Sequence, residues 1–577
     1  MNFLKTAIRW PPVVRLHPDR ADGSAGCNAQ ATARVQGAWI FGAAFLNVLL
    51  FFRYSIFSGF SRISGNAGDS RLAMAQLEHW RHVWSLDAAW HSPIYFHPVK
   101  AALGYGDAYF LYGAFYSLFR AVGADWFAAY DLTNIVVKLI GFFSFFYLAR
   151  KILKVRFSYA LLGTSVFFQL NSTAEHILHS QLLTVALVPL QLILVHHFAQ
   201  AVLDRSRRRL LIFGSAAIAL YAAWLMTAYY MAWFLALFAL TASVWYLRIA
   251  GSESRRQMLL AIKDSRRLLI ALAILGAVFL LPFIVTYLPT ALATGMYGHA
   301  EMVTNSGTPL DIINVGPRNV MYGSLLDRML VLVAGYPFPG YERTTGFTPA
   351  LLLLFLLGFI HCWRRPIGMD RRIVHAMLGA TVLLWIASLR FGHTHLFLWQ
   401  IVYYCIPGAK AMRVPPRLQI FIGFFVVLVA MILLDRKRWF DRPLPFAVLA
   451  MVLIAEQLNL SGGRGMTRDR ENWAFTSVPA PPAECRSFFV LREAERPGAK
   501  TPDESTRNID GMVVAERFNL PTLNGMASFF PPHWDLWRPL RSDYLDRVLA
   551  YARAQGVTDG LCSLDIPAGR WALIVPR

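Results

Sequence analysis

The chain alternates long apolar runs with short polar segments over most of its length. Runs of the length that crosses a bilayer lie at about 35–57, 126–150, 157–171, 180–203, 210–223, 225–248, 268–289, 347–363, 373–389, 418–434 and 443–460. A helix rises about 1.5 Å per residue, so the run 35–57 extends roughly 34 Å, enough to cross the hydrocarbon core. The pattern therefore predicts about eleven transmembrane helices.

Two further apolar runs, 107–122 and 396–407, are short. Clusters of Lys and Arg, which mark the cytoplasmic side of a membrane protein, separate the long runs at 150–156, 205–209, 248–267, 364–372 and 436–438. All of these clusters lie on the same side of the membrane only if the two short runs do not cross it. We therefore expect the short runs to form interfacial or re-entrant helices. If both crossed, the chain would have about thirteen spans. Either odd number places the N-terminus in the cytoplasm and the C-terminus in the periplasm.

The same pattern divides the chain into three parts. Residues 1–34 are polar and basic and are expected to form a cytoplasmic tail, and residues 35–460 are expected to form a transmembrane domain with an outer loop at 58–106. From Ser461 the apolar runs shorten while Pro, Asp, Arg and Gly increase, so residues 461–577 are expected to form a periplasmic domain. The predicted fold class is an all-α polytopic membrane protein with a small C-terminal α+β soluble domain.

In the C-terminal domain the pattern predicts strands at 488–491 and 571–575 and a helix at 544–554. Cys485 and Cys562 are the only cysteines of this domain. A disulfide between them and two unpaired buried thiols both remain open, because the expected compartment is oxidising and buried free cysteines are common.

Composition supports a membrane protein and argues against nucleic-acid binding. Hydrophobic residues make up 56% of the 577 residues, and the mean hydropathy is +0.43, which is too apolar for water-soluble cores alone. The net charge is +22, but the basic residues cluster between apolar runs, so we interpret the charge as a determinant of membrane orientation. The five cysteines include no C-x-x-C motif and predict no metal site.

The outer loop 58–106 contains the first candidate for chemistry, the segment from Gly65 to Arg71. It has two glycines and no aliphatic side chain, and it places Asp69 two residues before Arg71. A carboxylate there can act as a general base while the guanidinium holds an anion. The alternative is an ordinary surface Asp-Arg turn.

Further polar groups are expected on the same outer face, at the mouths of helices. Arg413 and Arg417 flank a Pro-Pro pair, where two guanidiniums could grip a phosphate, although they could also be anchors in the lipid headgroups. His176 and His179 share one helical face and, with Gln181, could bind sugar hydroxyls or phosphate; a metal site would lack a third ligand. Ordinary interfacial histidines are the alternative. The remaining candidates on this face are Asp107, Tyr297, Glu301, Glu342 and Arg343.

Taken together, these residues resemble the GT-C superfamily of multi-spanning glycosyltransferases, which includes protein O-mannosyltransferases and lipid A aminoarabinose transferases. The resemblance rests on Gly68-Asp69-Ser70-Arg71, Ser92-Pro93 leading to Asp107, His179-Ser180-Gln181, Ala228-Tyr229-Tyr230, Met412-Arg413-Val414-Pro415-Pro416-Arg417 and Leu523-Asn524-Gly525-Met526. The chain departs from the protein O-mannosyltransferases in lacking an Asp-Glu pair in its first loop, and it has no WWD-type string of an oligosaccharyltransferase.

The resemblance implies an enzyme of the bacterial inner membrane that transfers a sugar from a polyprenyl-phosphate carrier to a glycan, lipid or protein acceptor. In such an enzyme Asp69 would be the catalytic base, and Arg413, Arg417 and Arg71 would hold the carrier phosphate. No cofactor is certain, although Asp69, Asp107 and Glu342 could bind a divalent metal ion without a spacing signature. The alternatives are a transporter or flippase of lipid-linked sugars, an O-antigen-ligase-like transferase with a diphosphate-linked donor, and a structural scaffold.

Overall fold

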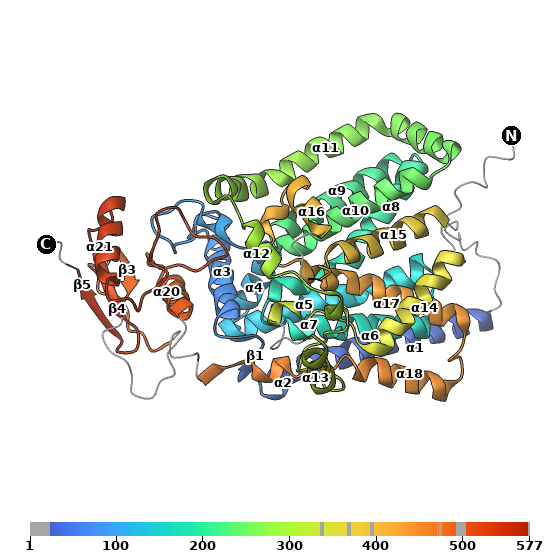
Figure 1. Ribbon diagram of the computed structural model, residues 1–577, viewed down its shortest axis with the longest axis horizontal. Coiled ribbons are helices and arrows are strands. Elements are labelled where there is room, and N and C mark those ends of the chain that lie inside the picture. The colour runs from blue at the N-terminus through green and yellow to red at the C-terminus, as the bar shows by residue number, and fades with distance from the viewer. Residues whose placement is uncertain are drawn as a thin grey trace.

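The computed structural model describes residues 23–334, 340–365, 371–392, 397–469, 471, 476–491 and 504–574. A helical bundle makes up most of the molecule, and a small domain with a sheet lies at one end of it (Figure 1). The helices of the bundle are α1 (Gly23–Phe51), α2 (Arg53–Phe57), α3 (Asp69–Trp84), α4 (Phe110–Ala121), α5 (Trp126–Tyr147), α6 (Phe157–Gln169), α7 (Asn171–Glu175), α8 (Val188–Leu203), α9 (Arg207–Leu225), α10 (Tyr229–Ile249), α11 (Ser252–Thr294), α12 (His299–Thr304), α13 (Gly323–Ala334), α14 (Pro349–Arg364), α15 (Arg371–Ala387), α16 (Trp399–Cys405), α17 (Leu418–Lys437) and α18 (Pro443–Ala455).

Every apolar run that was expected to cross the membrane contains a helix. Within the described ranges, 7 helices are long and apolar enough to span a bilayer, and α14 and α18 are shorter apolar helices. The prediction of a mainly helical, multi-pass membrane protein is therefore confirmed, and the number of crossings stays a prediction. The first helix begins at Gly23, so the end of the predicted tail is helical, while residues 1–22 lie outside the described residues.

The two short runs form short helices. The run 107–122 corresponds to α4, which has 12 residues, and the run 396–407 corresponds to α16, which has 7 residues; Leu396 lies outside the described residues. At about 1.5 Å per residue, α4 is roughly 18 Å long, much less than the roughly 30 Å of hydrocarbon that a crossing requires.

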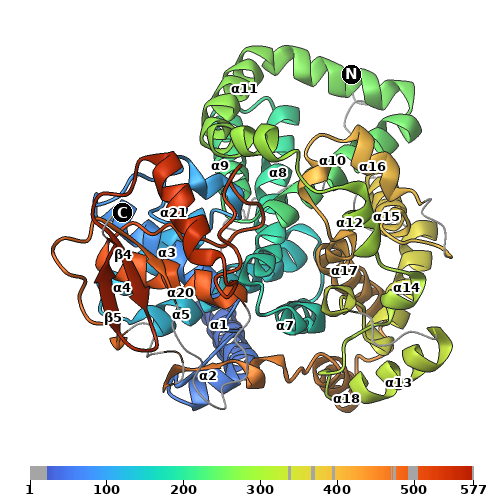
Figure 2. The ribbon, with the colours of Figure 1, turned by 60° about the vertical axis from the view of Figure 1, so that its left-hand side comes forward.

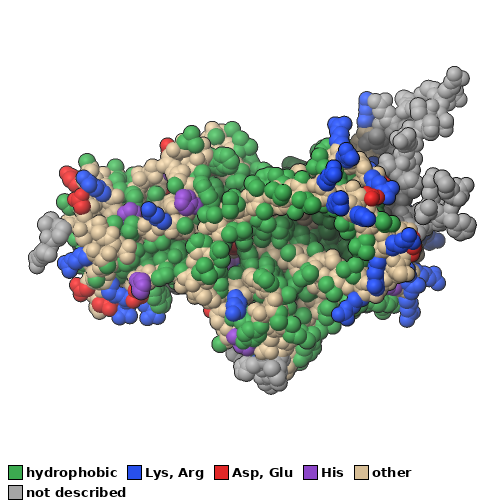
Figure 3. Space-filling model, turned by 90° about the horizontal axis from the view of Figure 1, so that it is seen from above, with side chains coloured by type: hydrophobic (Ala, Val, Ile, Leu, Met, Phe, Trp, Pro, Cys, Tyr) green, Lys and Arg blue, Asp and Glu red, His purple; other side chains and the backbone are tan. Residues whose placement is uncertain are grey.

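The basic clusters meet at one end of the bundle. Arg156 binds Asp435 with an N–O distance of 2.7 Å, and Arg205 binds Asp264 at 2.7 Å. Figure 3 shows Lys and Arg side chains gathered at the end of the molecule opposite the C-terminal domain, with a broad hydrophobic surface between the two ends. This distribution is the one that the positive-inside pattern leads us to expect.

Helix α17 lies in the middle of the bundle and is buried around nearly its whole circumference. A helix that is apolar on all sides can face lipid or lie among other helices, and α17 does the latter. Here α14 and α6 pack against it. Gly358 on α14 allows this approach, because a Cβ atom at that position would lie 2.9 Å from the carbonyl oxygen of Val429. The 43-residue helix α11 instead follows the edge of the bundle beside α9 (Figure 2).

The C-terminal domain is built on the strands β3 (Ser487–Val490), β4 (Leu561–Asp565) and β5 (Arg570–Leu573) and the helices α20 (Glu504–Phe518) and α21 (Tyr544–Gln555). The sheet order is β3-β4-β5, with β3 and β4 parallel and β4 and β5 antiparallel. The predicted strand 488–491, strand 571–575 and helix 544–554 correspond to β3, β5 and α21, although Val575 lies outside the described residues. The short strands β1 (Arg62–Ile63) and β2 (Met466–Thr467) pair the first outer loop with the segment that enters this domain.

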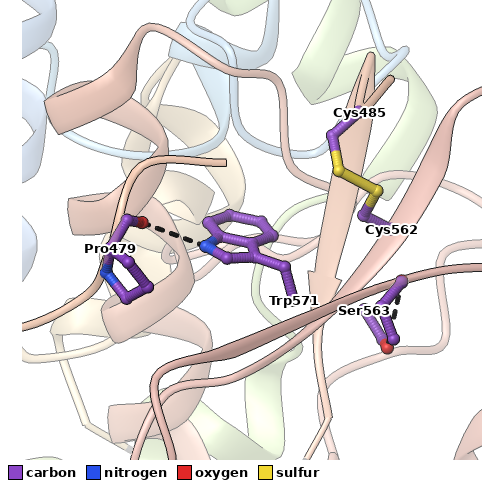
Figure 4. Close-up of a disulfide and its surroundings, with 6 residues drawn as sticks. Pro479, Cys485, Cys562, Ser563 and Trp571 are labelled. Carbon is purple, nitrogen blue, oxygen red and sulfur yellow. Dashed lines mark hydrogen bonds between the residues drawn. A yellow bond between two sulfur atoms is a disulfide. The ribbon is translucent and has the colours of Figure 1, made fainter. Parts of the chain in front are cut away.

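Cys485 and Cys562 form a disulfide (Figure 4). Their Cα atoms are 5.6 Å apart, and Cys562 lies on β4 while Cys485 lies two residues before the start of β3. The structure therefore decides between the two possibilities that the sequence left open. Beside the disulfide, the indole N–H of Trp571 donates to the carbonyl oxygen of Pro479 at 3.0 Å.

We expect the double variant Cys485→Ser/Cys562→Ser to lower the stability of the C-terminal domain by about 4 kcal/mol. The two cysteines are 77 positions apart, and closing a long loop restricts the unfolded chain. Hydrogen–deuterium exchange of peptides from β3 and β4, with and without reductant, measures this loss. Cys405→Ser, which removes an exposed free thiol, is the control. Equal protection of β3 in the double variant and in the wild type would contradict the prediction.

Candidate active site

A cavity of about 820 Å³ opens at the end of the bundle next to the C-terminal domain. Its volume lies within the range typical of small-molecule sites. Seven of the candidates from the sequence line it: Asp69, Asp107, His179, Gln181, Tyr297, Arg413 and Arg417. These residues come from segments spread over more than three hundred positions, so only the tertiary fold brings them together.

Asp69 is the first residue of helix α3 and does not lie in a loop, as the glycines around it had indicated. The helix begins here because Asn66 and Ser70 form reciprocal hydrogen bonds: the Asn66 N–H donates to Ser70 Oγ at 3.1 Å, and the Ser70 N–H donates to Asn66 Oδ1 at 3.4 Å. The Asp69 side chain is 48% exposed.

His179 links Asp69 to a second carboxylate. Its Nδ1 lies 3.9 Å from Asp69 Oδ2, and its Nε2 lies 3.5 Å from Glu342 Oε1. The Ser70 hydroxyl donates to the carbonyl oxygen of Leu178 at 3.2 Å, so the start of α3 and the histidine segment are held together. The imidazole therefore lies between the two carboxylates, near enough to interact electrostatically with both.

His176 does not line the cavity. It is fully buried and packs against the ring of Tyr341, with a centroid separation of 4.7 Å. Burial lowers the pKa of His176 to about 3, so its imidazole is neutral at physiological pH. Its Nδ1 lies 3.1 Å from the carbonyl oxygen of Ser172. We therefore assign it a packing role behind His179. Among the described residues, no group of three His, Cys, Asp or Glu side chains is arranged to hold a metal ion.

Glu342 stands behind the cavity wall and binds Arg417. Arg417 donates from Nε to Glu342 Oε2 at 2.9 Å and from Nη2 to Oε1 at 2.7 Å. Burial by itself would raise the pKa of Glu342, but the charges of Arg417 and His179 outweigh burial and hold the pKa below its usual value. The Arg417 guanidinium lies over the ring of Tyr230, 4.9 Å from its centroid. Arg417 is thus a buried charge whose position is fixed on two sides.

Arg413 is held more loosely. Its Nη1 lies 3.5 Å from Glu301 Oε1, and both side chains are nearly half exposed. Its guanidinium lies 5.6 Å from the centroid of the Tyr297 ring, while its backbone N–H donates to the hydroxyl of Tyr230 at 3.0 Å. The backbone of Arg413 is therefore fixed, but its side chain can reorganise around a ligand.

Asp107 and Gln181 complete the polar part of the wall. Asp107 Oδ1 accepts a hydrogen bond from the backbone N–H of Tyr229, the first residue of α10, at 3.0 Å. Burial raises the pKa of Asp107, and the Tyr229 hydrogen bond and the charge of Arg417 oppose that rise. Gln181 Oε1 accepts from the hydroxyl of Tyr109 at 2.7 Å. Both side chains thus have partners and can position a polar ligand.

Arg71 is the candidate that the structure places elsewhere. It is buried and forms ion pairs with Glu471 at 3.3 Å and with Asp510 on α20, and it is not part of the cavity wall. Its helical position turns its side chain away from Asp69 and toward the C-terminal domain. The expectation that Arg71 holds an anionic ligand in the cavity is therefore replaced by a structural role, the attachment of the C-terminal domain to α3.

Sequence reasoning missed several residues of the wall. Gln76 lies two helical turns after Asp69 on α3, and a search along that helix face could have found it. Lys410 lies three residues before Arg413, which was a usable signal. Ala527, Ser528 and Phe529 directly follow the segment from Leu523 to Met526. No local pattern indicated that the C-terminal domain contributes to the rim of the cavity.

One side of the cavity is apolar. Phe283, Ile284, Leu288 and Ala291 line it from α11, and their spacing places them along one face of that helix. Ile284 and Leu288 are 44% and 50% exposed. The cavity therefore joins a charged region beside Asp69 to an apolar wall at the edge of the bundle.

Comparison with known proteins finds a likeness in structure but none in sequence. No protein-family model and no curated protein matches the sequence. Among solved structures, the chain is similar to the single-particle cryo-EM structure of the arabinofuranosyltransferase AftD from Mycobacteria, with a TM-score of 0.43 and 15% sequence identity. The likeness covers 86% of this chain and 32% of that one, so this chain spans about a third of the length of AftD. A likeness this distant assigns no function.

Proposed function

We propose that this protein is a GT-C-type membrane glycosyltransferase that moves a sugar from a polyprenyl-phosphate carrier to an acceptor hydroxyl. The observation that carries the proposal is the shared cavity: Asp69 lines the same space as Arg413 and Arg417. A base, a cationic wall and an apolar wall are the three features that such a reaction requires of its protein.

The reaction is a single inverting displacement. The acceptor hydroxyl attacks the anomeric carbon, and Asp69 takes the proton of that hydroxyl as the new carbon–oxygen bond forms. The bond between the anomeric carbon and the phosphate oxygen breaks, and its electron pair leaves with the polyprenyl phosphate. The cationic wall stabilises the negative charge that develops on this leaving group.

The apolar wall is the natural place for the carrier chain. The carrier is a long hydrocarbon with one charged end, and its phosphate can reach the arginines only if the chain lies against an apolar surface. The face of α11 with Ile284 and Leu288 offers that surface next to the charged region. The setting we propose is a bacterial inner membrane, and the charge distribution of the bundle supports an orientation with the cavity on the periplasmic side.

The proposal predicts that the purified full-length protein, incubated with a labelled polyprenyl-phosphate sugar and a pool of glycan, lipid and peptide acceptors, releases free polyprenyl phosphate. The transferred sugar is expected to have the anomeric configuration opposite to that of the donor. Thin-layer chromatography of the lipid phase and NMR of the product measure the two results. Movement of intact donor across proteoliposomes without cleavage would favour the flippase alternative and contradict the proposal.

A further inference from the structure

Three cations of the cavity wall come from one short segment, and they differ in how their charge is balanced. Arg417 binds Glu342 through two of its three nitrogens, Nε and Nη2. Arg413 has Glu301 at 3.5 Å. Lys410 also lines the cavity and is exposed, and within the part of the chain that the structure describes it forms no ion pair with a carboxylate. Its ammonium lies 5.8 Å from the centroid of the Tyr403 ring.

The backbone that carries Lys410 is fixed on both sides. The hydroxyl of Tyr229 donates to the carbonyl oxygen of Gly408 at 3.0 Å, and the backbone N–H of Tyr297 donates to the carbonyl oxygen of Lys410 at 3.1 Å. Gly408 has φ +82, and a Cβ atom there would lie 2.0 Å from the Tyr229 hydroxyl oxygen. The segment therefore needs a glycine at position 408, and it presents Lys410 and Arg413 to the cavity from a rigid frame.

A phosphate that enters the cavity meets these cations under different conditions. Contact with Arg417 would compete with Glu342, whose side chain is only 22% exposed, and breaking a pair that includes a buried charge is costly. Contact with Arg413 displaces only a half-exposed partner, and such pairs contribute little. Contact with Lys410 displaces no carboxylate, and a lysine ammonium is a common point-charge ligand of phosphate.

We propose that Lys410 and Arg413 make the direct contacts to the phosphate ester of a lipid carrier, while Arg417 acts from behind as a fixed charge. This inference rests on the proposed function and deepens it, because it assigns a binding role to Lys410. The apolar face of α11 lines the same cavity, so the site fits a phosphate attached to a hydrocarbon chain better than a free anion.

The test measures binding of undecaprenyl phosphate to the full-length protein in detergent by native mass spectrometry, with undecaprenol, inorganic phosphate and phosphatidylglycerol as separate probes. Lys410→Met is expected to weaken undecaprenyl phosphate binding about tenfold, the effect of one charge-assisted contact, and to leave undecaprenol binding unchanged. Lys410→Arg is expected to keep most of the affinity. Lys437→Met is the matched control, because Lys437 is also exposed and lies 6.0 Å from an aromatic ring centroid, that of Trp439.

Several results would overturn the inference. One is equal affinity of Lys410→Met and the wild type for undecaprenyl phosphate. Others are an equal loss of undecaprenol binding, equally tight binding of inorganic phosphate, and no preference for the carrier over phosphatidylglycerol. The transfer assay separates this inference from the proposed function: sugar transfer that persists in Lys410→Met with unchanged carrier affinity refutes the inference alone. Carrier binding that depends on Lys410 in a protein that transfers no sugar refutes the proposed function alone.

Discussion

Asp69→Asn is expected to reduce sugar transfer by about 10²- to 10⁴-fold, the contribution typical of general-base catalysis. The asparagine amide is nearly the same size as the carboxylate but cannot accept a proton. Asp69 begins α3 and is about half exposed, so the substitution removes the base without creating a cavity. Initial rates with a labelled polyprenyl-phosphate sugar, together with binding of undecaprenyl phosphate, measure the effect, and binding is expected to persist.

The control is Asp87→Asn, an exposed carboxylate that follows α3 on the same outer segment and does not line the cavity. It is expected to transfer sugar at the wild-type rate. Near-normal transfer by Asp69→Asn would remove Asp69 as the base. Loss of carrier binding together with transfer would instead point to a role of Asp69 in binding, and it would contradict the mechanism proposed above.

The membrane part of the fold could be predicted from the sequence because a single variable, the length of each apolar run, determines whether a helix can span a bilayer. The same variable identified α4 and α16 as too short. The length of an apolar run predicts less well where a helix begins. Asp69 was expected in a loop because glycines and polar residues surround it, but the pairing of Asn66 with Ser70 starts a helix there. Whether such a segment forms a loop or begins a helix depends on the geometry of its side-chain hydrogen bonds. The amino-acid composition of the segment does not describe that geometry.

The site could be predicted only in part. The sequence indicates at which end of the bundle a loop lies, but it does not indicate which residues that loop will contact. Alternation of the spans placed Asp69 and Arg413 at one end, and both line the cavity. Arg71, two residues from Asp69, instead meets Asp510, which is 439 positions away. No local pattern distinguishes these two outcomes, since helix geometry and the docked C-terminal domain decide them.

The arrangement also separates the charges that are fixed from those that can respond to a substrate. Glu342, Arg417 and His179 form a connected group at the back of the cavity, whereas Asp69, Lys410 and Arg413 are exposed to it. Enzymes that stabilise developing charge gain most from groups whose orientation is set before the reaction. The connected group of Glu342, Arg417 and His179 therefore determines how precisely the exposed side chains are placed. Loss of this connected group is expected to affect both stability and catalysis.

Glu342→Gln is expected to destabilise the protein by about 3 kcal/mol, the lower end for breaking a buried ion pair, because it leaves the buried guanidinium of Arg417 without its counter-ion. The pKa of Glu342 is lowered in the folded protein, so its stabilising effect is fully present above the ordinary Glu pKa of about 4.3 and is lost as the pH falls toward the lowered value. Chemical unfolding of both proteins in detergent from pH 7 to pH 3 is expected to show a constant difference above about pH 5 and a shrinking one below about pH 4.

The matched control is Glu301→Gln, which removes the partner of Arg413 from a pair that is nearly half exposed on both sides and is expected to cost less than about 1 kcal/mol. A double-mutant cycle identifies the cause. The loss of unfolding free energy in the double variant Arg417→Met/Glu342→Gln is expected to be smaller than the sum of the losses in the two single variants, because neither charge is then left alone. Transfer by Glu342→Gln is expected to fall more than carrier binding, since Arg417 and His179 lose their common anchor. An unfolding difference that does not change with pH, or equal costs at Glu342 and Glu301, would contradict the assignment of Glu342 as that anchor.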